Sequence, residues 1–304
     1  MCEDCAAHGR LHEHGDAMEG KRRHDVAFHD DCEYLHHGPG GEAAIPRPAQ
    51  GGPKVLAVCG KGGVGKTSVA AMAVHELMHH DPAAHILVID ADPAVGLSTA
   101  LAVNVVRTVD DVRNDIIDSS KTGDAGDVTA ILDRLDYEVF QAMAEQDGYA
   151  FLAIGRPETE GCYCKVNDYL KDIIEGLVEH FDYVVIDGEA GIEQVNRRVL
   201  ETVTHLLLVS DCSRKGLAVV QTIKQVADGG VLPYDHVGLL LSRVHASEDA
   251  RHIDAGGVEI LGCIMEDDAV RTFDIEGESL LKLPHGDAAM VEVGCALHRF
   301  GVLG

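Results

Sequence analysis

Residues 60–68 read GKGGVGKTS, follow an apolar run at residues 55–59 and lead into a segment with helical spacing of apolar residues. The order strand, G-x-x-x-x-G-K-[ST], helix is typical of a phosphate-binding loop, and a chance glycine-rich turn does not explain the full pattern together with its context. Backbone N–H groups of such a loop surround an anion, and the helix N-terminus adds a favourable dipole. Lys66 is expected to reach the terminal phosphates, and Thr67 to ligate Mg²⁺. The predicted nucleotide contacts in this loop are Gly60, Gly62, Gly63, Val64, Gly65, Lys66, Thr67 and Ser68.

The composition predicts a globular α/β protein without a membrane span. A chain of 304 residues with 46% apolar residues is long enough for one well-cored domain plus an extension. No apolar segment of about 18 residues is present, and the polar start of the chain does not resemble a signal peptide. We therefore expect a cytoplasmic location.

The chain is strongly acidic. It has 25 Lys plus Arg against 51 Asp plus Glu, a formal net charge of −26. This charge opposes binding to nucleic acid or to an anionic membrane through a broad surface. We therefore expect neither nucleic acid nor membrane as a partner. The negative charge itself fits plain solubility or a saline habitat equally well.

Residues 1–50 differ from residues 51–304 in composition. Residues 1–37 hold three of the 9 cysteines and seven of the 18 histidines, and a Gly/Pro-rich linker follows. Cys2 and Cys5 form a C-x-x-C pair that offers soft ligands for zinc or nickel. A solvated tail without a metal explains the same composition equally well. Residues 51–304 are expected to form the phosphate-binding domain.

Strand and helix patterns alternate after this linker, which predicts a doubly wound, mostly parallel sheet with helices on both faces. Helical spacing is visible at about residues 67–79, 166–178 and 215–227 and in a short tail helix. Residues 101–148 are expected to be mostly helical, with a loop at 122–127. The predicted strands are residues 55–59, 85–89, 149–154, 181–186, 204–211, 237–242 and 258–264.

Carboxylates follow two of these strands, at the edge where open α/β sheets place their ligands. Asp90 and Asp92 come after the strand at residues 85–89. Asp187 ends the strand at residues 181–186, which is the Walker B arrangement for holding Mg²⁺ through water. A capped turn into the next helix is the alternative interpretation of Asp90 and Asp92.

Cys162 and Cys164 form a C-x-C pair before an amphipathic helix. A helix start lowers the pKa of a thiol and favours the thiolate, the form that binds metal. The pair is poorly placed for a disulfide within itself. Two copies around a two-fold axis would supply the four sulfurs that zinc or nickel accepts. Two buried or idle thiols remain the alternative interpretation.

Residues 61–67, KGGVGKT, match the deviant loop K-G-G-x-G-K-[ST] and resemble the superfamily of nitrogenase iron protein, MinD and ParA, which are P-loop NTPases of the SIMIBI type. The resemblance implies a nucleotide-sandwich homodimer in which Lys61 reaches the nucleotide of the partner. It also implies that Asp92, supported by Asp90, positions the attacking water or engages the Mg²⁺ shell. Gly191, in a D-x-E-A-G segment, would be the pivot of switch II.

Residues 155–170, GRPETEGCYCKVNDYL, resemble a segment of the CooC-type accessory ATPases that mature nickel carbon monoxide dehydrogenase. This resemblance implies ATP hydrolysis coupled to release of Ni²⁺ or Zn²⁺ from Cys162 and Cys164 at the dimer interface. The implied client is carbon monoxide dehydrogenase/acetyl-CoA synthase or a related enzyme. The resemblance covers about residues 54–304. Ser242 departs from it, because the superfamily often has an adenine-reading asparagine there, which puts strict ATP preference in doubt.

Two other functions fit the same loop. An ATP-dependent reductase like nitrogenase iron protein would carry an iron–sulfur cluster between subunits, but that family uses two cysteines far apart in sequence. A positioning ATPase like MinD or ParA would act on a membrane or on DNA, which the net charge and a tail without a basic amphipathic face disfavour.

Overall fold

A computed structural model describes residues 52–121, 128–156, 164–188, 192–250 and 253–304. They form an eight-stranded sheet in the order β3-β4-β2-β5-β1-β6-β7-β8. Every pairing is parallel except the antiparallel pairing of β3 with β4. The strands are β1 (Lys54–Gly60), β2 (Ile86–Asp90), β3 (Ala144–Gln146), β4 (Tyr149–Ala153), β5 (Tyr183–Asp187), β6 (Val203–Ser210), β7 (Tyr234–Val244) and β8 (Glu259–Met265).

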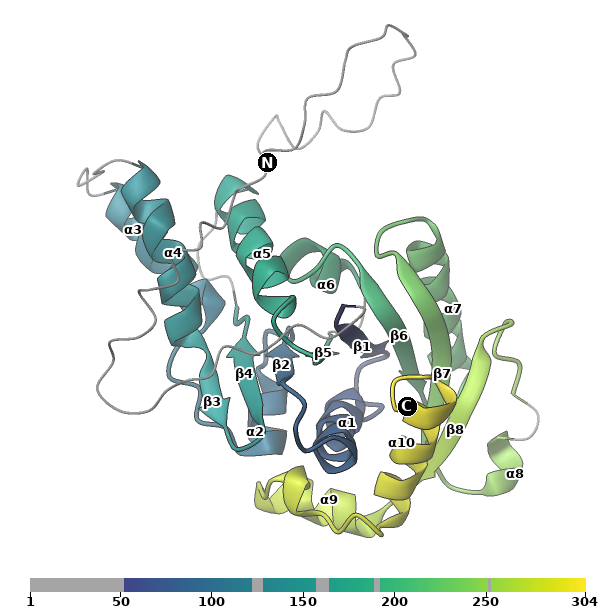
Figure 1. Cartoon of the computed structure of the whole chain (residues 1–304). Coiled ribbons are helices and arrows are strands. Elements are labelled where there is room, and N and C mark those ends of the chain that lie inside the picture. The colour runs from purple at the N-terminus through teal and green to yellow at the C-terminus, as the bar shows by residue number, and fades with distance from the viewer. Residues whose placement is uncertain (1–51, 122–127, 157–163, 189–191, 251–252) are drawn as a thin grey trace, which may run out of the picture. The chain divides into compact units, whose positions relative to one another are not determined.

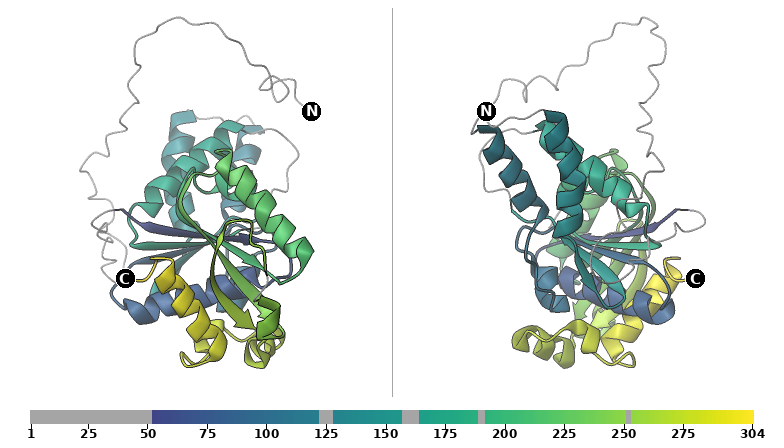
Figure 2. Two further views of the ribbon diagram at one scale, coloured as in Figure 1. Left: turned by 90° about the vertical axis from the view of Figure 1, so that its right-hand side faces the viewer. Right: turned by 60° about the vertical axis from the view of Figure 1, so that its left-hand side comes forward.

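Helices cover both faces of the sheet (Figures 1 and 2). One face carries α1 (Lys66–His80), α2 (Gly96–Leu101), α9 (Asp268–Glu276), the 3-10 turn η3 (Leu280–Lys282) and α10 (Ala288–Arg299). The other carries α3 (Val109–Lys121), α4 (Val128–Ala142), α5 (Cys164–Val178), α6 (Glu193–Arg198), α7 (Arg214–Asp228) and the short α8 (Ser247–Ala250). This is the predicted doubly wound arrangement.

Strand β1 shows why the sequence folds this way. Val55, Ala57 and Cys59 pack into the core on one face, whereas Leu56 and Val58 pack into the core on the other. Successive side chains of a strand point to opposite faces, so a continuous apolar run is what a strand covered by helices on both sides requires. Cys59 is fully buried, and this burial raises the pKa of its thiol to about 12. Cys59 is therefore a core residue.

The seven predicted strands are all present, but several short elements escaped the sequence patterns, among them β3, α2 and α9. The edge strand β3 is only three residues long and lies in a region expected to be mostly helical. The helix α2 has six residues, and α9 buries no residue fully. Short or exposed elements lack the periodic apolar pattern from which secondary structure is inferred. None of the described helices is long and apolar enough to cross a membrane. The proposed extension at residues 1–50 lies outside the described residues and stays a prediction.

Candidate functional site

The candidate nucleotide site lies at the carboxyl ends of three adjacent strands. β1 lies between β5 and β6, and β5 lies between β1 and β2. The chain therefore crosses from one half of the sheet to the other beside β1, which is where ligands bind in open α/β sheets. Asp90, the last residue of β2, is paired in register with Asp187, the last residue of β5. The predicted carboxylates thus meet next to the loop that follows β1.

The loop itself has the backbone that its glycines allow. Gly60 has φ 152°, and a Cβ there would lie 2.1 Å from the carbonyl oxygen of Val209 on β6. Gly65 is the N-cap of α1 with φ 90°, in the left-handed region that favours glycine. Any other residue at Gly60 would push β1 away from β6, so this glycine serves the sheet as well as the ligand.

Lys66 is only 8% exposed, and its Nζ lies 3.5 Å from the carbonyl oxygen of Lys61. The ammonium group is therefore folded back over the loop. A buried ammonium with one long hydrogen bond among the described residues is well suited to bind an anionic partner, because the anion would replace the hydration lost on folding. This geometry fits the predicted phosphate contact.

Asp187 carries the strongest electrostatic signal in the site. It is 1% exposed, and neither of its carboxylate oxygens has a hydrogen-bond partner among the described residues. Burial raises the pKa of this carboxyl to about 7; nearby Thr67 lowers it, and the charge of Asp90 raises it. The Thr67 hydroxyl is close enough to influence the carboxylate, but it is not at hydrogen-bond geometry. An unpartnered buried carboxylate beside a hydroxyl suits hydrated Mg²⁺, which accepts oxygen ligands.

Asp90 and Asp92 differ in what they contact. Asp90 is fully buried, and its oxygens accept hydrogen bonds from the backbone N–H of Leu97 at 2.9 Å and of Asp92 at 3.2 Å. Burial raises the pKa of Asp90 to about 6, although these backbone bonds act against the rise. Asp92 is half-buried and accepts from the N–H of Ala94 at 2.8 Å. Asp90 thus fixes the segment after β2, whereas Asp92 retains an oxygen for a ligand.

Lys61 is paired with a residue that the sequence analysis did not single out. Its Nζ lies 2.9 Å from Oδ2 of Asp211, which follows β6, and both side chains are partly exposed. Partial burial acts to raise the pKa of Asp211, but hydrogen bonds from Ser213 and Lys61 lower it below its usual value. Asp211 follows the carboxyl end of a strand, as Asp90 and Asp187 end theirs. The same rule of position would have found it.

A small pocket lies beside the loop, between the residues that follow β6 and the carboxyl end of β7. It has a volume of about 210 Å³. Its lining includes Asp211 and Arg243, and a Cβ at Gly65 would lie 3.4 Å from Ser242 Oγ and 3.8 Å from Arg243 Nε. Arg243 has φ 54°, a left-handed conformation that is uncommon for such a side chain. The lining residues are Asp211, Cys212, Ser213, Arg243, Val244, His245 and Asp249.

The predicted metal ligands are only partly within the described chain. Cys164 is the first residue of α5. Cys162, Gly191, Cys2 and Cys5 lie outside the described residues. The C-x-C site and the pivot of switch II therefore stay predictions.

Gly155, which precedes the cysteine segment, is hydrogen-bonded to α6, the helix that follows β5 in sequence. Arg198, the last residue of α6, donates from Nη1 to the carbonyl oxygen of Gly155 at 3.0 Å. Its Nη2 pairs with the buried carboxylate of Asp110 on α3, and the N–H of Asp110 donates to Ile154 at 2.9 Å. On the carboxyl-terminal side, Arg113 of α3 donates from Nε to Oδ1 of Asn167 at 2.8 Å. One guanidinium therefore joins three elements next to residue 156.

Comparisons with known proteins agree with this geometry. Residues 54–230 match the AAA_31 family model, described as an AAA domain. An uncharacterized ATP-binding protein of Methanocaldococcus jannaschii is 31% identical over 245 residues, which are 79% of this chain and 95% of that protein. The carbon monoxide dehydrogenase accessory protein CooC of Rhodospirillum rubrum is 27% identical over 270 residues, covering 81% of this chain and 97% of CooC.

Solved structures share the fold at lower identity. The septum site-determining protein MinD of Pyrococcus horikoshii, in complex with Mg-ADP, aligns with a TM-score of 0.58 and 19% identity over 83% of this chain and 98% of MinD. A ParA family ATPase of Chlorobium tepidum aligns with a TM-score of 0.58 and 19% identity over 81% of this chain and 99% of its own. The chain belongs to the AAA_31 family of P-loop ATPases, is similar in sequence to CooC and shares its fold with MinD and ParA.

Proposed function

We propose that this ATPase is a metallochaperone that forms a nucleotide-sandwich homodimer and delivers Ni²⁺ to carbon monoxide dehydrogenase or a related metalloenzyme. Two observations on the likeness to CooC support a metal client. The relative CooC is an accessory protein of carbon monoxide dehydrogenase. Residues 155–170 also match the CooC-type segment around Cys162 and Cys164. Zn²⁺ is the alternative cargo, because both ions accept thiolate ligands.

The contact of Arg198 with Gly155 carries this proposal. Arg198 belongs to α6, which follows the loop after Asp187. Gly155 is the first residue of the segment that leads to the two cysteines, and it accepts a hydrogen bond from Arg198. Any movement of α6 that follows γ-phosphate loss would therefore act on the backbone before the cysteines. Nucleotide switches work through such ordering and release of a segment.

The nucleotide chemistry would use residues that already lie together. Lys66 would contact the terminal phosphates, and the loop N–H groups would hold them at the N-terminus of α1. Thr67 and Asp187 would hold Mg²⁺, which neutralises charge on the phosphate oxygens when bound. Asp92 would orient the attacking water, while Asp90 keeps the segment in place. The site would then hydrolyse ATP to ADP and phosphate.

Dimerisation would change the partner of the Lys61 ammonium group. In the single chain its ammonium is held by Asp211. We expect Lys61 to leave Asp211 and reach the nucleotide of the partner, where the triphosphate offers more negative charge than one carboxylate. Two copies of the cysteine pair would then supply four thiolates.

Metal analysis of the purified protein with and without ATP tests this function. Wild type is expected to bind Ni²⁺ or Zn²⁺ between subunits and to dimerise with ATP, and the variant C162S/C164S to lose that metal. Retention of full nickel or zinc binding and of ATP-dependent dimerisation by the double variant would refute the C-x-C site. A variant lacking residues 1–50 tests the extension in the same assay, because loss of metal by that variant alone would make the extension the collector. A brown protein with stoichiometric iron would favour the reductase instead, and co-sedimentation with DNA or liposomes would favour a positioning ATPase.

A further inference from the structure

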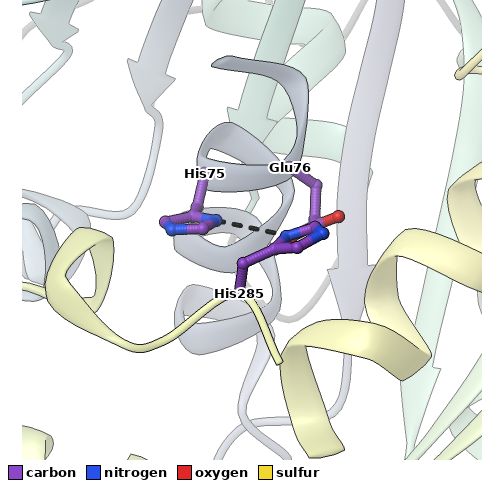
Figure 3. A group of neighbouring side chains, drawn as sticks. All are labelled: His75, Glu76 and His285. Atoms are coloured by element: carbon purple, nitrogen blue, oxygen red, sulfur yellow. Dashed lines mark hydrogen bonds and ion pairs between the residues drawn. The ribbon is translucent and has the colours of Figure 1, made fainter. Parts of the chain in front are cut away.

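Histidines surround one buried glutamate, Glu76, near the C-terminal end of α1. The nucleotide site lies at the other end of this helix. His75 and Glu76 lie on α1, and His285 lies between η3 and α10 (Figure 3). At a rise of 1.5 Å per residue, His75 is roughly 14 Å along the helix axis from Lys66. No sequence pattern links these three residues, because His285 is more than two hundred positions away from the other two.

The ligand atoms of the three side chains converge. His75 Nδ1 lies 3.4 Å and His285 Nδ1 lies 2.9 Å from Oε1 of Glu76. Ligand atoms of all three side chains lie within 4.8 Å of one another. Two ligands that are each bound at about 2.0–2.1 Å in a tetrahedral site stand about 3.4 Å apart. The observed spacings are close to what one ion requires, so small side-chain rotations would complete the site.

Glu76 is held in place and needs a cationic partner. It is 5% exposed, and within the described residues its recorded ion-pair partners are the two histidines and no lysine or arginine. A Cβ at Gly294 on α10 would lie 2.6 Å from Oε2 of Glu76. The glycine thus leaves room for the carboxylate against α10. A buried carboxylate is stable when it is paired with a cation or coordinates a metal.

His285 is also held by stacking. Its ring lies 3.9 Å, centroid to centroid, from the ring of His79, and 6.2 Å from that of His75. Three imidazoles packed this closely repel one another when protonated, whereas neutral imidazoles are the form that binds metal. His75 and His79 are four residues apart and thus lie on the same face of α1.

We propose that His75, Glu76 and His285 form a second metal site, for a divalent transition ion of the Zn²⁺ or Ni²⁺ class. Two imidazoles and one carboxylate suit these ions, and the half-exposed side chain of His285 leaves a further position open to water or to a ligand in solution. The bound ion ties the end of α1 to the segment before α10. This site uses none of the cysteines and does not depend on the function proposed above.

Zinc titration of the full-length protein tests this site, with bound zinc per chain and Tm as the two readouts. The variants H285Q and H75Q are each expected to lose one zinc equivalent, because removal of a ligand weakens binding by more than about 100-fold. They also lose the part of the zinc-induced rise in Tm that this site contributes, roughly 5 to 10 °C at about 100 times Kd. H85Q is the matched control, since His85 also pairs with a carboxylate, that of Asp182 at 3.3 Å, but lies outside the cluster.

The background C162S/C164S separates this site from the proposed cysteine site. On that background one zinc equivalent and the Tm rise remain, and H285Q removes both. Cobalt bound there shows no thiolate-to-metal charge-transfer band, because the ligands are nitrogen and oxygen. If H285Q and H75Q keep the wild-type zinc number and Tm rise, the cluster is a hydrogen-bond network only and the proposal is wrong. That result would leave the nickel proposal intact, and loss of nickel by C162S/C164S alone would leave this one intact.

Discussion

One buried carboxylate lies near each end of α1, and the two differ in the partners that compensate for their burial. At the N-terminal end, Asp187 is buried without a hydrogen-bond partner among the described residues. Toward the other end, Glu76 is equally buried but has two imidazole partners from separate segments. Burial of an ionised carboxylate costs free energy unless a partner compensates for it.

This difference bears on the stage of the nucleotide cycle at which a cation would bind next to Asp187 or next to Glu76. With no partner for Asp187 among the described residues, its burial stays uncompensated until a cation binds, and under the proposed function that cation would be the Mg²⁺ that comes with ATP. The imidazoles around Glu76 are part of the fold, so that end can bind an ion at any stage of the nucleotide cycle. The comparison predicts that the two ends can be disabled separately.

The largest expected effect is that K66A and H285Q each lose one property and keep the other. Removal of the Lys66 ammonium should lower ATP hydrolysis by at least about 100-fold, because a charge that stabilises the transition state is lost. The same variant should keep the zinc-induced rise in Tm. H285Q should do the reverse, and phosphate release and Tm measured on both variants would check this. Loss of both properties in either variant would contradict separate ends.

The next effect is on stability and concerns Asp187. Since its pKa is raised to about 7 in the folded state, its neutral form favours folding below about pH 4, and this stabilisation is lost as the pH rises toward 7. The total is at most on the order of 4 kcal/mol, taken as about three pKa units.

Urea unfolding at pH 5 and pH 8, without nucleotide or Mg²⁺, measures the loss. D187N should lose less stability than wild type between these pH values. Part of the dependence should remain in D187N, because the pKa of Asp90 is also raised, to about 6. Identical pH profiles for D187N and wild type would show that Asp187 is not the responsible group.

A smaller effect concerns the contact of Arg198 with Gly155, which joins the nucleotide end to the cysteine segment. R198K keeps a positive charge beside Asp110 but loses the two-pronged hydrogen bonding of the guanidinium. ATP-dependent metal release should fall roughly tenfold, the value of one hydrogen bond from a charged donor, while hydrolysis changes less. The exposed neighbour Arg197 provides the control R197K. Equal effects of both variants on release would argue against this coupling.

The smallest effect should come from D211N. The Asn oxygen can still accept from Ser213, but its attraction for Lys61 is gone. Partly exposed ion pairs contribute about 0–1 kcal/mol, so the ATP-dependent dimer should tighten by up to about fivefold. Sedimentation with ATP measures this, and D249N removes the same charge from the same pocket as a control. Weaker dimerisation of D211N than of D249N would contradict a resting role for the Lys61–Asp211 pair.

The sequence determined the sheet, the phosphate-binding loop and the carboxylates after β2 and β5. These features are local, since a strand, a glycine-rich turn and a helix start are encoded within about ten consecutive residues. Strand β3 was missed because three residues are too few to show an alternating pattern, whereas α9 was missed although Asp267 and Gly277 are capping residues at its two ends. Asp211 was missed although its position after β6 follows the same rule as Asp90.

Only the tertiary structure decided which distant residues act together. It joined Lys61 to Asp211, Arg198 to Gly155, and Glu76 to His285, pairs separated by 150, 43 and 209 positions. It also left Asp187 without a hydrogen-bond partner in the described part of the chain, which no pattern within the strand reports. Local sequence encodes the conformation of a segment, whereas burial and charge pairing depend on which segments pack against one another.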